Sequence, residues 1–211
     1  MKPAVATLPE ALGAFSPETP DIHVRRFRTR KVALKHRHWV RGEPVATAFF
    51  NALSAVFPHG EAFMIESLIP WQSRASGKLA QDIAAFVEQE ASHSREHIVM
   101  NKALIDAGFD LKPLDRAIRA FVSFFADSGE ITKLGATMCI EHITAIVSAE
   151  LLRTTHHMQD SDPELHKLWL WHGIEEIEHK AVAFDVWMMA TAHWSGLRRW
   201  LTRSAMCVAV T

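Results

Sequence analysis

Residues 89–93 read Gln-Glu-Ala-Ser-His, and residues 175–179 read Glu-Glu-Ile-Glu-His. Each stretch contains a Glu-x-x-His motif, in which the glutamate and the histidine are three positions apart. On an α-helix such positions share one face, so each motif presents a carboxylate beside an imidazole. Apolar residues recur every three or four positions around both motifs, which predicts that each lies on the inward face of a long helix.

Helical periodicity extends over most of the chain after residue 44. The predicted long helices cover about 44–69, with an interruption at the Pro58-His59-Gly60 run, and then 78–107, 130–158 and 163–190. The joins within the first and second pairs of long helices are short, so each pair should form an antiparallel hairpin. A longer connection with a short helix over 113–126 separates the pairs. We therefore predict an all-α fold, a ferritin-like four-helix bundle with one long crossover.

The two ends of the chain differ from the bundle. Residues 1–43 are expected to form an extended basic N-terminal arm, 44–192 the metal-binding bundle, and 193–211 a C-terminal tail. Eight arginines and lysines and no acidic residue fall within 24–41. This stretch is interpreted either as a solvated surface or as a contact with an anionic partner, such as a membrane surface or an acidic substrate.

Composition limits the class of protein. The chain has 211 residues, of which 48% are hydrophobic and 22% charged, so it should fold as one globular domain. The net charge of −1 argues against nucleic-acid binding, and Cys139 and Cys207 cannot form a disulfide framework. We expect a cytoplasmic protein. Peripheral membrane contact through the basic segments and formation of a homodimer are both left open. The absence of tyrosine excludes a mechanism that needs a tyrosyl radical.

The inward carboxylates require a compensating charge, because burying one unpaired carboxylate costs several kcal/mol. Glu90 and Glu176 belong to the two motifs, Glu141 lies on the inward stripe of the third long helix, and the first helix has Glu61 or Glu66. Two Glu-x-x-His helices and one glutamate from each of two other helices form the ligand set of di-iron and di-manganese carboxylate bundles. The sequence therefore predicts two metal ions in the core.

Hairpin geometry favours Glu61 over Glu66. In an antiparallel pair, ligands that meet should lie at similar distances from the connecting loop. The midpoint between Glu141 and Glu176 falls beside the predicted turn at 159–163. The midpoint between Glu61 and Glu90 likewise falls inside the predicted loop at 73–77, whereas the midpoint for Glu66 lies beyond that loop.

Further histidines share these faces. His172 precedes the Glu176 position by four residues and is the preferred third imidazole ligand, whereas His97 is either a ligand or a hydrogen-bonded core residue. His142 points about 100° away from its neighbour Glu141 and should support the site or contact another helix. Metal-bound imidazoles usually donate their other N–H to a carboxylate or a carbonyl, so Glu175 should orient His93 and Gln89 should orient His179. The predicted ligands are Glu61, Glu90, His93, Glu141, His172, Glu176 and His179; Glu66, His97 and His142 are alternatives or supporting residues, and Gln89 and Glu175 are supporting residues.

Three runs of residues resemble a known family. They are Phe-Pro-His-Gly-Glu at 57–61, Gln-Glu-Ala-Ser-His at 89–93 with His97 and Asn101, and Trp-His-Gly-Ile-Glu-Glu-Ile-Glu-His-Lys at 171–180 with Phe184-Asp185. These residues are similar to the bacterial family called predicted metal-dependent hydrolases, over residues 22–200. The resemblance implies a metal and a hydrolytic reaction. The ligand spacing also resembles that of the ferritin-like di-iron superfamily, whose arylamine N-oxygenase branch similarly has a third histidine at the position of His172.

Two reactions compete for such a site. Carboxylates with a few imidazoles suit iron first, with manganese or zinc as alternatives. The ligand set favours a di-iron oxidase or oxygenase that activates O₂ and acts on a small organic substrate, whereas the family resemblance implies hydrolysis by a metal-bound hydroxide. Iron storage or peroxide protection is a weaker alternative, and a metal-free interaction module would leave the carboxylates uncompensated. Phe49, Phe57, Phe86 and Met138 are expected to line an apolar substrate cavity.

Overall fold

The computed structural model describes residues 21–30, 32 and 34–211. Within these residues it contains helices and no strand, which confirms the predicted all-α class. Residues 1–20 of the predicted arm lie outside the described residues. The elements are α2 (Pro44–Gln72), α3 (Gly77–Asp106), α4 (Lys112–Ala126), α5 (Glu130–Arg153), the 3₁₀ turn η1 (Thr155–Met158), α6 (Pro163–Ala190) and α7 (Gly196–Val210).

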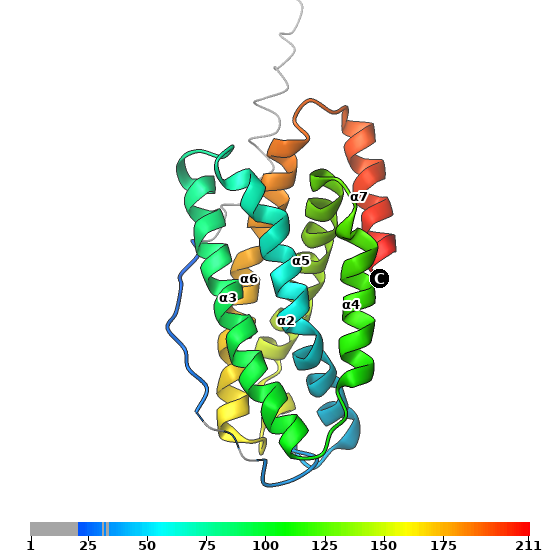
Figure 1. The fold of residues 1–211 in the computed structure, drawn as a ribbon. Coiled ribbons are helices and arrows are strands. Elements are labelled where there is room, and N and C mark those ends of the chain that lie inside the picture. The colour runs from blue at the N-terminus through cyan, green and yellow to red at the C-terminus, as the bar shows by residue number, and fades with distance from the viewer. Residues whose placement is uncertain (1–20, 31, 33) are drawn as a thin grey trace, which may run out of the picture.

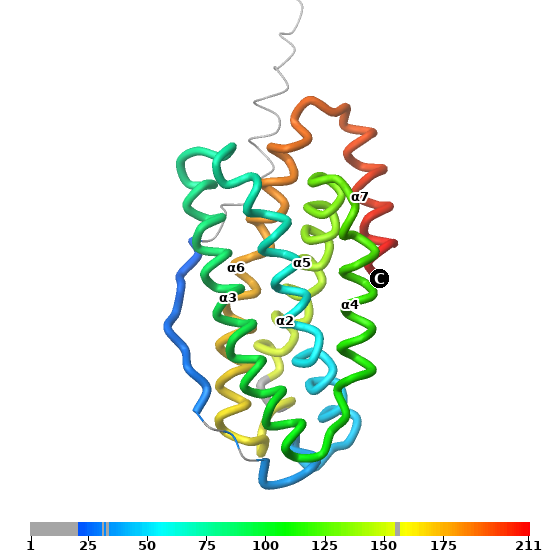
Figure 2. The backbone as a smooth tube through the Cα atoms, in the orientation of Figure 1, coloured from blue at the N-terminus to red at the C-terminus, as the bar shows by residue number. Residues whose placement is uncertain are grey.

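The four long helices α2, α3, α5 and α6 lie side by side as a bundle (Figure 1). α2 and α3 run antiparallel through a short loop, and α5 and α6 form a second hairpin (Figure 2). α4 lies in the connection between the two hairpins and packs along α2. The observed architecture is therefore a helical bundle with one long crossover, in which four inward faces meet.

Local sequence accounts for several helix ends. The side chain of Asp162 accepts hydrogen bonds from the backbone N–H groups of Glu164 and Leu165, and Pro163 occupies the first turn of α6. α3 ends just before Gly108, whose φ of 85° is a conformation that glycine adopts without strain. These residues therefore fix the start of α6 and the end of α3.

α2 runs without a break through Pro58, so the predicted interruption at 58–60 is wrong, and the helix extends to Gln72, past the predicted end at about residue 69. A proline inside a helix has no N–H, and the carbonyl four residues earlier loses its partner. That carbonyl belongs to Ser54, and the side-chain amide of Asn101 on α3 donates to it over 2.8 Å. The neighbouring helix thus supplies the hydrogen bond that the proline removes, and α2 continues.

The tail predicted over 193–211 contains a further helix, α7, which packs against α5. The side chain of Ser195 caps its start by accepting from the N–H of Arg198. The close approach depends on Gly135, because a Cβ there would lie 3.1 Å from Cγ of Met206. None of the α7 residues is buried, but Met206, Cys207 and Val210 are half-buried at helical spacing and pack against the core.

Two apolar clusters fill the bundle at different heights. One joins the second half of α2 to the starts of α3 and α5 and the end of α6, and its members include Phe63, Leu68, Ile83, Phe86, Leu134 and Val186. The other joins the opposite ends of the same helices, and its members include Phe50, Met100, Leu104, Leu151, Leu165 and Trp169. On each helix the candidate ligands fall between these two levels, so the polar centre is enclosed above and below by apolar packing.

α5 is the one described helix that is long and apolar enough to cross a membrane by length and composition. However, 56% of its apolar window is buried inside the bundle, and it carries Glu141 in the core. These are properties of a core helix packed against α6, so its length and composition are only weak evidence for a membrane span.

Phe125 anchors α4 to the bundle, and we expect the Phe125→Ala variant to lower the free energy of unfolding by about 3–5 kcal/mol. Its side chain is 2% exposed and its ring lies 5.8 Å from that of Phe63. The neighbouring Phe124 is 75% exposed, so Phe124→Ala should cost less than about 1 kcal/mol. Urea unfolding followed by circular dichroism measures both values, and equal losses would contradict this packing.

Candidate metal centre

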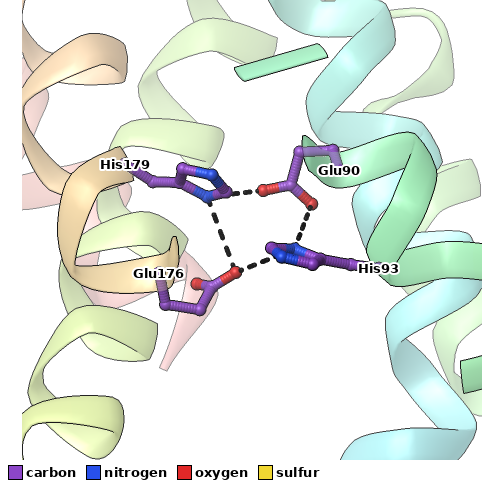
Figure 3. Close-up of side chains that lie close together, drawn as sticks. All are labelled: Glu90, His93, Glu176 and His179. Carbon is purple, nitrogen blue, oxygen red and sulfur yellow. Dashed lines mark ion pairs between the residues drawn. The ribbon is translucent and has the colours of Figure 1, made fainter. Parts of the chain in front are cut away.

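α3 and α6 place the two Glu-x-x-His motifs opposite each other in the core (Figure 3). Glu90, His93, Glu176 and His179 are all buried, and their side chains point toward one another. One nitrogen or oxygen from each of the four lies within 4.8 Å of the others, which is close enough for all of them to contact one ion. Two consecutive turns of each helix therefore create a compact set of donors.

The distances within this set are short. His179 Nδ1 lies 2.7 Å from Glu90 Oε1 and 3.5 Å from Glu176 Oε1. His93 Nδ1 lies 3.6 Å from Glu176 Oε1 and 3.9 Å from Glu90 Oε2. Each imidazole thus faces both carboxylates through the same ring atom, Nδ1.

The helices α2 and α5 contribute the remaining carboxylates. Glu61 forms a second group with His93 and His172, again with one donor atom each within 4.8 Å of the others. Glu141 Oε2 lies 3.7 Å from His179 Nδ1. All seven predicted ligands thus lie in one cluster, and each is at most 2% exposed.

Many donor atoms in this cluster have no hydrogen-bond partner within the described parts of the chain. The unpaired atoms are both carboxylate oxygens of Glu90 and Glu141, Oε1 of Glu61, Oε2 of Glu176, and Nδ1 of His93 and His179. His179 Nδ1 and Glu90 Oε1 count as unpaired despite their short distance, because the two groups are not aligned for a hydrogen bond. Buried polar atoms are normally satisfied, so this concentration of unpaired acceptors fits bound cations.

The pKa values of Glu61, Glu141 and His93 reflect the same shortage of positive charge. Burial, and next the charge of Glu90, raise the pKa of Glu61 well above its usual value. Burial and Glu176 do the same for Glu141. Burial alone would lower the pKa of His93, but its hydrogen bond to Glu175 and the charge of Glu90 raise it to about 9. His93 therefore holds a proton at neutral pH, and bound cations would supply the same positive charge.

The outer nitrogens of the two motif histidines have the partners that the sequence predicts. His93 Nε2 lies 3.0 Å from Glu175 Oε2, and His179 Nε2 lies 2.9 Å from Gln89 Oε1. Burial alone would raise the pKa of Glu175, but its hydrogen bonds to His93 and the Arg25 N–H lower it, so the side chain is a carboxylate. Each imidazole is thereby oriented with Nδ1 toward the centre.

His97 lies behind the cluster and contacts it through His172. His172 Nε2 lies 3.0 Å from Glu176 Oε1, and its Nδ1 lies 2.7 Å from His97 Nε2. His97 Nδ1 in turn lies 2.9 Å from the hydroxyl of Ser54. Burial and the charge of His172 hold the pKa of His97 well below its usual value, so it is neutral. Of the two alternatives for His97, the geometry favours the hydrogen-bonded core residue.

Two of the alternatives lie away from the cluster. The side chains of Glu66 and His142 are exposed on α2 and α5. Glu66 is five residues from Glu61, which turns it off the inward face, and His142 directly follows Glu141. The interpretation of either residue as a ligand or as a support for the ligands does not fit the structure.

The N-terminal segment contacts this site in a way that the sequence pattern did not predict. The backbone N–H of Arg25 donates to Glu175 Oε1 over 2.9 Å, and that of His23 donates to Glu178 Oε2 over 3.0 Å. The N–H of Thr29 donates to Glu96 Oε2 over 2.6 Å. Residues 21–30 thus run extended along the bundle, held by buried carboxylates (Figure 1).

The same contacts change the interpretation of the basic stretch. The guanidinium of Arg25 lies 2.6 Å from Glu178, so at least one basic residue of 24–41 binds the protein's own bundle. Glu96 and Glu178 are both buried, although neither is among the supporting residues predicted from the sequence. A basic segment next to helices with surplus acidic residues was the signal that could have indicated this docking.

An apolar pocket of about 780 Å³ reaches the cluster at His172 and Glu176. Of the four predicted lining residues, Phe49 and Phe57 do line this pocket. Phe86 and Met138 instead belong to the apolar cluster on the far side of the polar centre, so their prediction is wrong for this pocket. Phe50, Leu53 and Trp169 also line the pocket and were missed, because a lining residue and a core residue have the same helical periodicity.

We expect Glu61→Gln to reduce the metal content of the protein by at least one ion, because it removes a buried negative donor. The matched variant Glu66→Gln changes an exposed glutamate on the same helix and should retain the full metal content. Elemental analysis after dialysis against buffer with and without iron or manganese measures both. Equal metal content in the two variants would remove Glu61 from the ligand set.

Glu175→Leu should weaken metal affinity by about 10- to 100-fold, the usual effect of removing a partner that orients a ligating imidazole. Glu88→Leu is the control, because Glu88 is exposed on α3. Competition with a fluorescent chelator measures the affinities, and circular dichroism checks that both variants fold. An unchanged affinity in Glu175→Leu would mean that His93 does not depend on this contact.

Comparison with known proteins adds one finding. A family model described as a predicted metal-dependent hydrolase matches residues 23–211, which include all seven clustered side chains. The search of curated proteins and the search of solved structures found no match. Because the matched region covers nearly the whole sequence, the chain belongs to the family of predicted metal-dependent hydrolases.

Proposed function

We propose that this protein is a dinuclear metal-dependent hydrolase that cleaves an ester or amide with an apolar substituent. The observation that carries the proposal is the buried cluster of four carboxylates and three imidazoles, whose unpaired donor atoms adjoin an apolar pocket. The family to which the chain belongs supports hydrolysis over the oxidase that the ligand spacing favoured. Water would supply its hydroxyl to the acyl carbon and its hydrogen to the leaving group.

Two ions would divide the cluster between them. His93 belongs to both groups of donors, but its Nδ1 can bind only one ion. His93, His172 and Glu61 would hold one ion, and His179 and Glu141 would hold the other. Glu90 and Glu176, which face histidines on both sides, would complete the set of residues that holds the ions.

Bound divalent cations supply Lewis acidity and lower the pKa of water toward neutrality. The protein's own residues would direct the substrate to the centre and limit the access of water. His172 and Glu176 are the two clustered ligands that line the pocket, so a substrate approaches the centre on their side. Phe57 packs against His172 with ring centroids 4.7 Å apart, which keeps that approach apolar and limits access of bulk water.

O₂ activation by a di-iron form is the second candidate, and the donor set favours it. Four carboxylates with three imidazoles are rich in oxygen donors, which suits iron and manganese. Zinc hydrolases usually rely more on histidine, so the donor set and the family description point to different reactions.

One pair of assays separates the two. We expect the protein loaded with manganese or zinc to hydrolyse p-nitrophenyl esters, with activity lost in Glu61→Gln and retained in Glu66→Gln. The ferrous protein should consume O₂ no faster than the Glu61→Gln variant under the same conditions. If the ferrous protein takes up O₂ stoichiometrically and no metal supports ester hydrolysis, the proposed hydrolase function is rejected in favour of O₂ activation.

A further inference from the structure

The walls of the pocket consist almost entirely of hydrocarbon. α2 contributes Phe49, Leu53 and Phe57 on one side, and α5 contributes Ile146 and Val147 on the other. These two helices belong to different hairpins, and the groove between them is not filled by side chains. The pocket therefore favours an apolar ligand.

Most polar side chains gather at the two ends of the pocket. At the inner end, His172 and Glu176 connect the pocket to the candidate metal centre. At the outer end, Arg41 and Glu43 precede α2, and His157 lies in the turn after α5. A ligand that fits this pattern has a polar group at the metal end and a long apolar part along the groove.

The groove is elongated. On α2 its lining extends from Val45 to Phe57, which are twelve positions apart and therefore about 18 Å apart along the helix. Along this length several lining side chains are open to solvent: Val45 is 82% exposed, Phe49 49% and Ile146 56%. A ligand that extends along the groove would cover these apolar side chains, whereas one confined to the inner end would leave them in water.

We propose that the groove binds an unbranched aliphatic chain, so that the substrate is an amphiphile with its ester or amide at the His172 and Glu176 end. This inference rests on the proposed function for the identity of the reacting group, but the chain-binding groove stands on the pocket alone. A compact aromatic ligand would fill only the inner end. A peptide would bring N–H and C=O groups for which the apolar walls have few partners.

Binding of neutral alcohols tests the groove without requiring metal or catalysis. Calorimetric titration of the purified protein with 1-hexanol, 1-octanol, 1-decanol and 1-dodecanol should show affinity rising about threefold to fourfold for each added methylene. Benzyl alcohol should bind more weakly than 1-dodecanol. Affinity that does not grow with chain length, or that is highest for benzyl alcohol, would overturn the proposal.

A pair of alanines on α2 provides a matched control. Ala46 lines the groove near its outer end, whereas Ala48 is exposed and does not line it. Ala46→Trp should lower the affinity for 1-dodecanol by about tenfold or more while leaving 1-hexanol unchanged, because only the longer chain reaches this position. Ala48→Trp should bind both alcohols with the same affinity as the parent protein. If both variants, or neither, lose affinity for 1-dodecanol, the groove does not bind the aliphatic chain at Ala46.

Two further results complete the test. If Ala46→Trp fails to fold, Ile146→Lys places a charge in the groove at a half-exposed site and should likewise reduce 1-dodecanol binding. Chain-length-dependent binding without ester hydrolysis would retain the groove and reject the hydrolase. Hydrolysis of p-nitrophenyl acetate and p-nitrophenyl laurate with equal KM would reject the groove and retain the hydrolase.

Discussion

Carboxylates that share a buried centre repel one another, and this repulsion is the constraint around which the bundle is built. Glu61, Glu90, Glu141 and Glu176 come from four different helices and meet at one level. Burial of a single uncompensated carboxylate already costs several kcal/mol, so the folded chain needs protons or cations between them. The raised pKa values of Glu61, Glu141 and His93 are the response of the protein's own groups to this demand. Metal binding would meet the same demand and would couple the stability of the fold to the site.

The surrounding structure keeps these groups in place. Apolar clusters enclose the polar level on both sides, and Glu175 and Gln89 hold the outer nitrogens of the two motif histidines. Glu175 also accepts the backbone N–H of Arg25, so an extended segment far away in the sequence is connected to His93 through one carboxylate. The orientation of the ligands thus depends on contacts between α3, α6 and residues 21–30.

The pocket gives the centre its access to substrate. It opens between α2 and α5, and it reaches the ligands only at His172 and Glu176. Hydrolysis and O₂ activation could both use such an approach, because the donor set determines the chemistry whereas the groove determines what can enter. An apolar groove beside a strongly polar centre is the arrangement expected when a long hydrocarbon part binds while a polar group reacts.

The sequence alone determined the features that depend on local periodicity. The two Glu-x-x-His motifs and the inward position of Glu141 follow from residue spacing on a helix, and so do the four long helices and their hairpins. The hairpin argument also singled out Glu61, which the structure buries in the cluster, over the exposed Glu66. Such spacing is informative because a helix repeats every 3.6 residues whatever its partner is.

Other features depend on a partner from elsewhere in the chain, so they become visible only in the folded protein. α2 continues through Pro58 because Asn101, on another helix, bonds the carbonyl that the proline leaves open. Phe57 lines the pocket and Phe86 packs in the core, although both lie on inward stripes. Glu178 is buried because an extended segment docks on it. Periodicity indicates which side of a helix faces inward, but what it meets there is set by contacts between distant segments, which no local pattern encodes.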